Sequence, residues 1–175
     1  MKTEILFPEV ANLCGDLMNV TYLRQCCLEM EVVETGLKDR PAFLDGGVDL
    51  VYVGSATERG LQLMVKALAP YRAELERYVD GGGLMLATGN ALDALGEYGV
   101  IDGKRAFDGL GILKTHAEYH MMKRHNSFLL GSFQDMEIVG FKSLFGHTYP
   151  NSELTDALFR VERGVGRHPG AFAEG

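Results

Sequence analysis

The tripeptide Thr88-Gly89-Asn90 lies where chains of this pattern place reactive side chains. An apolar run, Leu84–Ala87, precedes it, and a short helical pattern, Ala91–Leu95, follows. A buried strand that runs directly into a helix places the turn at the carboxyl edge of a parallel sheet, where open α/β sheets bind their ligands. A sharp turn of this kind also holds the nucleophile of many acyl-transfer enzymes. Gly89 occupies the tip, so the pattern predicts a nucleophile position that carries no nucleophile.

The polar residues beside Gly89, Thr88 and Asn90, are weak candidates for catalytic groups. The Thr88 hydroxyl lies one position early and has no identifiable base, and a hydroxyl without a base is a weak nucleophile at neutral pH. We therefore reject Thr88 as a nucleophile. Asn90 is predicted to cap the N-terminus of the following helix, where Asp93 would favour the positive end of the helix dipole.

The elements that must position this turn alternate between strand and helix up to Gly96. Strands are predicted at residues 4–7, 31–35, 48–53 and 84–87, and helices at residues 17–30 and 58–79. Pro70 should kink or split the second helix. This alternation predicts an α/β fold with a flavodoxin-like, doubly wound parallel sheet. Beyond Gly96, short apolar segments predict an antiparallel β extension, with strands at residues 119–123, 127–133, 136–141 and 158–161.

Size and composition limit the classes of function. The 175 residues suffice for one domain, and the net charge of −7 argues against binding nucleic acid, which requires a basic surface. No apolar run approaches the roughly 18 residues of a membrane span, so no membrane partner is expected. The first residues show no apolar stretch of the signal-peptide kind, so no signal peptide is expected, and the three cysteines form neither a metal spacing nor an even disulfide set. We expect a cytoplasmic protein.

In this setting the sequence resembles the class I glutamine amidotransferases of the cobyric acid synthase type (CobB/CobQ-like). Within them it is most similar to the GatD-like small subunit of the complex that amidates lipid II. The family reads G-G-x-hydrophobic-L-A-x-C-G-G-Y-Q-L-L-G around the turn. Leu86, Ala87, Leu95 and Gly96 match this motif, whereas the family's cysteine falls on Gly89. The resemblance spans nearly the whole chain and implies a single amidotransferase-like domain over residues 1–175.

A second family motif, the oxyanion loop G-G-G-Q-D-R, corresponds to residues 54–59. The matching residues are Gly54 and Arg59, and the changed ones include Ser55, Ala56 and Glu58. Where the family's glycines need positive φ, side chains at these positions would redirect the N–H groups of the loop. The alternative is a plain strand-to-helix connection in which Thr57 caps the helix.

Two further motifs are kept only in part. The family's Y-G-D-R-G-N loop corresponds to residues 14–19, which retain Gly15, Asp16 and Asn19. Cys14 belongs to this loop and not to the nucleophile turn, and it is expected to be a packed thiol. The motif G-F-E-N-H-x-G-R-T-Y corresponds to residues 140–149, where the Asn-His pair becomes Ser143-Leu144 and the arginine becomes His147.

The family's catalytic histidine lies in a G-T-Y-L-H-G-P stretch that would follow Gly175. Two alternatives stay open: the natural chain extends past Gly175, or the base is absent. His116, His120 and His125 could contribute to a metal site, because the first two would share one face of a strand, or they could be surface or loop histidines. The pair His116 and His120 would need a third ligand, which cannot be placed from the sequence, so we expect no metal and no cofactor.

Three hypotheses for function follow. The first is a degenerate, non-hydrolysing amidotransferase domain that serves as a binding or partner subunit of an ATP-dependent amidoligase of cell-wall or cobalamin type. The resemblance implies a Mur-ligase-like synthetase as the partner and a glutamine-like ligand. The second is an enzyme or binder of another small molecule. Its polar cleft would be formed by Ser55, Thr57, Thr88, Asn90, Ser143 and His147. The third is a structural subunit that uses one face for dimerisation.

Overall fold

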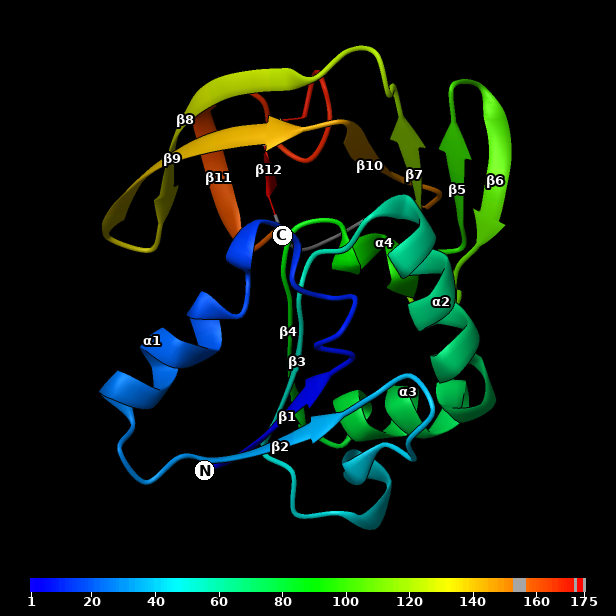
Figure 1. Cartoon of the computed structure of the whole chain (residues 1–175). Coiled ribbons are helices and arrows are strands. Elements are labelled where there is room, and N and C mark those ends of the chain that lie inside the picture. Colours follow the sequence, from blue (N-terminus) through cyan, green and yellow to red (C-terminus); the bar gives the residue numbers. More distant parts are fainter. Residues whose placement is uncertain (153–156, 172, 175) are drawn as a thin grey trace.

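The computed structural model describes residues 1–152, 157–171 and 173–174. Its first sheet has four parallel strands in the order β2-β1-β3-β4 (Figure 1). The strands are β1 (Lys2–Leu6), β2 (Glu31–Thr35), β3 (Leu50–Val53) and β4 (Leu84–Ala87). The strand order reverses between β1 and β3, which is the switch point where flavodoxin-like sheets place ligands. The predicted flavodoxin-like parallel sheet is thus confirmed.

Helices cover both faces of this sheet (Figure 1). The helix α1 (Met18–Cys26) lies on one side, and α2 (Glu58–Leu68), α3 (Arg72–Asp80) and α4 (Ala91–Leu95) lie on the other. The prediction that Pro70 splits the long helix is confirmed, because a 3-10 turn over Ala69–Tyr71 separates α2 from α3. Within the described residues, no helix combines the length and the apolar content that crossing a membrane requires.

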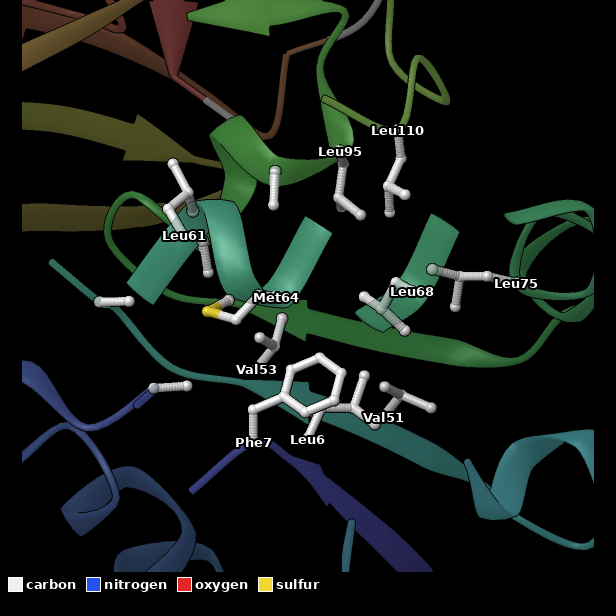
Figure 2. Close-up of a cluster of buried hydrophobic side chains, with 14 of the residues drawn as sticks. Leu6, Phe7, Val51, Val53, Leu61, Met64, Leu68, Leu75, Leu95 and Leu110 are labelled. Atoms are coloured by element: carbon white, nitrogen blue, oxygen red, sulfur yellow. The ribbon is translucent and has the colours of Figure 1, made fainter. Parts of the chain in front are cut away.

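The main core lies between the sheet and the face of α2 (Figure 2). Val53 of β3 points toward Met64 of α2 and Val51 toward Leu68, and all four side chains are at most 2% exposed. Burying a side chain of this size contributes about 1.5–3 kcal/mol relative to exposure. This packing holds the carboxyl end of β3 in a fixed position beneath the start of α2.

The second half of the chain forms two more four-stranded sheets, in the orders β10-β7-β5-β6 and β12-β11-β8-β9. Their strands are β5 (Tyr98–Ile101), β6 (Lys104–Asp108), β7 (Thr115–Tyr119), β8 (His125–Phe133), β9 (Met136–Leu144), β10 (Gly146–Pro150), β11 (Phe159–Arg163) and β12 (Ala173–Glu174). Apart from β5 and β7, which pair in parallel, neighbouring strands in these two sheets run antiparallel. The predicted β extension is thus confirmed as mainly antiparallel.

Individual boundaries in this half differ from the predictions. The β8–β9 hairpin was predicted, but the strand predicted at residues 119–123 is wrong, because β7 ends at Tyr119 and a turn follows. The strands β6 and β10 were not predicted. Their sequences, KRAFD and GHTYP, are short and polar, and tertiary pairing determines their conformation more than local propensity does.

Candidate site at the carboxyl edge of the parallel sheet

The loops that follow β1, β3 and β4 meet at one carboxylate, that of Asp16. This side chain lies in the loop after β1, and its Oδ2 accepts a hydrogen bond from the Ser55 main-chain N–H at 2.5 Å. The same oxygen accepts a hydrogen bond from the Thr88 hydroxyl at 2.7 Å. Ser55 follows β3 and Thr88 follows β4. A single side chain therefore joins the three loops at the switch point of the sheet.

Further donors fix Asp16 in this position. The hydroxyl of Tyr52, a fully buried residue on β3, donates to the Asp16 carbonyl oxygen at 2.8 Å. The side-chain amide of Asn19 donates to Asp16 Oδ1 at 2.7 Å. Burial alone would raise the pKa of Asp16, but the hydrogen bonds from Ser55, Thr88 and Tyr52 outweigh it and lower the pKa. The loops that Asp16 joins therefore stabilise its ionised form.

Gly89 has the left-handed backbone expected of a nucleophile turn, with a φ of +55°. The space that a side chain would need at this position is already filled. A Cβ added to Gly89 would lie 2.7 Å from the Cβ of Ser55 and 3.5 Å from its Oγ. The strand-turn-helix geometry is thus present, but the Ser55 side chain lies in the space that the Cβ of any residue at this position would need.

Asn90 does not cap α4 as predicted. The structure shows no side-chain cap at the start of this helix. Instead Asn90 Oδ1 accepts a hydrogen bond from the Ala56 N–H at 2.9 Å, and its Nδ2 donates to the Ala56 carbonyl oxygen at 2.8 Å. This arrangement uses both the oxygen and the nitrogen of the Asn90 amide, whereas a cap would use only the oxygen. Asn90 therefore ties the turn after β4 to the loop after β3.

The N–H groups of the loop after β3 are consequently occupied by the protein itself. Asp16 accepts from Ser55, and Asn90 accepts from Ala56. Stabilising a developing oxyanion would require such N–H groups to point at the reacting atom. In this arrangement the two N–H groups of Ser55 and Ala56 serve internal contacts.

The remaining residues of the loop have structural roles. Thr57 caps α2 as predicted, because its hydroxyl accepts from the Gly60 N–H at 3.1 Å. Gly54 packs against the Ala11 carbonyl oxygen so closely that a Cβ would collide with it. Arg59 is exposed on the first turn of α2.

Within the residues that the structure describes, Ser143 and His147 are not hydrogen-bonded to the group formed by Asp16, Ser55, Thr88 and Asn90. Ser143 is exposed on β9, and His147 is buried on β10. None of the hydrogen bonds among the described residues links either side chain to Asp16, Thr88 or Asn90. The Nδ1 of His147 is buried without a hydrogen-bond partner, and the His125 ring lies edge-on at 5.2 Å. Burial, together with nearby His125, lowers the pKa of His147.

The lowered pKa of His147 predicts a loss of stability on acidification. As the pH falls below about 6.5, the unfolded chain binds a proton at His147 before the folded chain does, so the free energy of unfolding decreases. This decrease ends once the pH is below the folded-state pKa. Thermal unfolding across this range should show a smaller decrease for His147→Phe than for the wild type. The exposed His120→Phe serves as the control, and equal pH slopes for the wild type and His147→Phe would contradict the prediction.

Asp93, which was expected to favour the positive end of the helix dipole, is a buried carboxyl group. It is 6% exposed and accepts hydrogen bonds from the hydroxyls of Tyr119, at 2.5 Å, and Thr148, at 2.9 Å. Burial raises the pKa of Asp93, and the two hydroxyl donors offset only part of this effect. The group connects α4 to β7 and β10, and so anchors the helix that follows Gly89.

Other sequence predictions at this site are corrected by the structure. His116 lies on β7, but His120 lies beyond its end, so the two do not share a strand face. Among the described residues, no group of three or more His, Cys, Asp or Glu side chains is placed to hold a metal ion. Cys14 is exposed, with a φ of +57°, and is not a packed thiol. The roles of Asp16 and Tyr52 were missed, although Asp16 stood in a recognised motif.

Comparison with known proteins identifies the fold and not the family. No protein-family model matches the sequence, and no curated protein matches it significantly. Solved structures do match, among them one described as a crystal structure of glutamine amidotransferase, with a TM-score of 0.58 and 16% sequence identity. The match covers 90% of this chain and 79% of the other. The chain thus has a glutamine amidotransferase-like fold, and at this identity the likeness shows the fold alone.

Proposed function

We propose that this chain, with its glutamine amidotransferase-like fold, is a degenerate CobB/CobQ-like domain of the GatD-like type that no longer hydrolyses glutamine. It acts as the partner subunit of an ATP-dependent, Mur-ligase-like amidoligase of cell-wall or cobalamin type. The observation that carries the proposal is the pair Gly89 and Ser55. The tip of the turn bears no thiol, and Ser55 of the neighbouring loop lies in the space that the Cβ of a cysteine would need.

The surroundings of Gly89 support the same conclusion. Hydrolysis through an acyl-enzyme requires a nucleophile, a base and oxyanion donors. In the described part of the chain, no histidine is hydrogen-bonded to the turn, and the Ser55 and Ala56 N–H groups are occupied by Asp16 and Asn90. Replacing one group could be compensated by its neighbours, but three altered groups at one turn support loss of the reaction.

A reducing, cytoplasmic location fits this proposal. Cys14, Cys26 and Cys27 are free and exposed in the structure. Exposed thiols without a disulfide are typical of proteins in reducing compartments. The same location holds the ATP that a Mur-ligase-like partner would consume.

A reconstitution experiment tests the proposed function. The chain is combined with a Mur-ligase-like synthetase, and amide formation is measured with glutamine or with an ammonium salt as the nitrogen source. We expect a stable complex that uses ammonium but not glutamine. The matched control replaces all three cysteines with serine and should behave identically. Glutamine turnover by that cysteine-free chain with the partner present would overturn the proposal.

A further inference from the structure

The outer side of the β8–β9 hairpin carries an unusual number of exposed apolar side chains. Phe128 is 79% exposed, Val139 is 71% and Phe141 is 60%. Phe128 lies opposite Phe141, and Leu130 lies opposite Val139, so the four residues form one continuous patch. Because side chains alternate along a strand, the intervening Leu129 points inward and is buried. We call Phe128, Leu130, Val139 and Phe141 the hairpin patch.

The hairpin patch lies at the periphery of the molecule. The strand β9 is at the edge of its sheet, and Figure 1 shows the hairpin at the upper left, away from α2 and α3. The rings of Phe128 and Phe141 contact each other at 5.4 Å between centroids, but their outer surfaces face solvent. Contiguous exposed apolar surface of this kind marks an interaction site.

A charged row borders the hairpin patch on the same face of the sheet. Arg160 of β11 lies opposite Ser132 of β8, which in turn lies opposite Glu137 of β9. Arg160 and Glu137 are both exposed, and neither forms an ion pair among the described residues. The row therefore presents a positive charge at one side of β8 and a negative charge at the other. Its two ends are complementary to each other.

We propose that the hairpin patch and this charged row form the interface of a homodimer. A two-fold axis parallel to β8 would stack two copies face to face, with β9 of each copy over β11 of the other. Glu137 would then face Arg160 of the second copy, and Phe128 would pack on Phe128 of the second copy. Stacked sheets lie about 10 Å apart, a gap that Arg and Glu side chains together can span.

The charges select this axis over the alternative. A two-fold axis across the strands would place the charged row over the row of Asn126 and Ser143, which lies at the other end of the hairpin patch. Both charges would then be covered by neutral side chains, which is unfavourable. The axis parallel to β8 instead pairs them, and it places the exposed Arg163, which lies opposite Leu130, in the row beside Glu137 of the second copy. An isologous interface requires a self-complementary surface, and the axis parallel to β8 provides it. The inference is independent of the proposed function.

Analytical ultracentrifugation of the whole chain across micromolar concentrations tests this proposal. We expect a reversible species of twice the 19.2 kDa chain mass. Glu137→Arg and Arg160→Glu should each weaken dimerisation at least about tenfold, because each places like charges opposite one another. The double variant E137R/R160E should restore it. Phe128→Asp should give a monomer, whereas the control Lys104→Glu, an exposed charge reversal on β6, should have no effect.

Recovery of dimerisation in the double variant E137R/R160E would be specific for this geometry, because it requires residue 137 of one copy to face residue 160 of the other. Circular dichroism would verify that each variant is folded, since all the changed side chains are exposed in the structure. A wild-type chain that remains monomeric across the range would overturn the proposal. A dimer that survives Phe128→Asp, or a double variant as weak as the single ones, would overturn it as well.

Discussion

Replacing Gly89 with cysteine is expected to lower the free energy of unfolding by about 2–5 kcal/mol and to leave the protein without glutaminase activity. Two costs contribute. A residue with a Cβ must adopt the left-handed backbone at φ +55°, and its Cβ must share space with the Ser55 Cβ, which would be 2.7 Å away. Real Cβ atoms do not approach so closely, so the loop after β3 must move.

A double variant separates the two costs. Ser55→Gly removes the colliding side chain, so S55G/G89C should recover about 1–3 kcal/mol of the loss measured for G89C alone. The matched control is Gly111→Cys, because Gly111 has a φ of +65° and open space around its Cβ position. That control should show only the backbone cost of about 1–2 kcal/mol.

Denaturant unfolding of the single and double variants measures this coupling. If G89C costs no more than G111C, or if Ser55→Gly brings no recovery, Ser55 does not fill the nucleophile position. Activity is read in parallel. The double variant should remain inactive, because the Ser55 and Ala56 N–H groups stay occupied and no histidine in the described residues reaches the turn through a hydrogen bond.

The second large effect is expected at Glu4, a fully buried carboxylate on β1. Its Oε1 accepts from the Thr35 hydroxyl and the Ala42 N–H, both at 2.6 Å, and its Oε2 accepts from the Phe43 N–H at 2.7 Å. Glu4→Gln places an amide donor against one of these donors. The free energy of unfolding should fall by about 2–4 kcal/mol, because a charge-assisted bond is lost and a buried N–H is left without a partner.

Glu31→Gln is the matched control for this change. Glu31 lies on the neighbouring strand β2, its side chain is 71% exposed, and it forms only a long contact of 3.9 Å to Lys2. Its replacement should change stability by less than about 0.5 kcal/mol. Equal effects of the two substitutions in chemical denaturation would show that the buried carboxylate contributes nothing specific.

The parallel half of the fold was predictable because its signals are local. Leu50–Val53 and Leu84–Ala87 are short apolar runs, which are typical of strands covered on both faces. That burial is found for β3, whereas β4 lies at the edge of the sheet with Leu84 and Leu86 exposed, so only its strand conformation was predicted correctly. Pro70 has no N–H to continue a helix, and its position alone predicted the break between α2 and α3. The strand-turn-helix around Gly89 was likewise predictable from local signals, because its apolar strand, its turn and its helical pattern are adjacent in the sequence.

The contacts that define the site could not be predicted from local signals. Ser55 and Gly89 are far apart in the sequence, and nothing in either segment indicates that one fills the space beside the other. Asn90 was assigned to a cap because local capping preferences were the only evidence, whereas its true partner is Ala56. Glu4 gave no signal of burial, since a glutamate at alternate spacing in a strand is usually exposed.

Trapping experiments test the central claim most directly. The chain, with its partner synthetase present, is exposed to a diazo-ketone analogue of glutamine and then examined by intact-mass and peptide mass spectrometry. We predict an unmodified chain, because the turn at Gly89 offers neither a thiol nor the room for one. A covalent adduct of the analogue whose formation glutamine prevents, on any residue of the chain, would contradict the account; slow alkylation of the exposed Cys14, Cys26 or Cys27 that glutamine does not prevent would not.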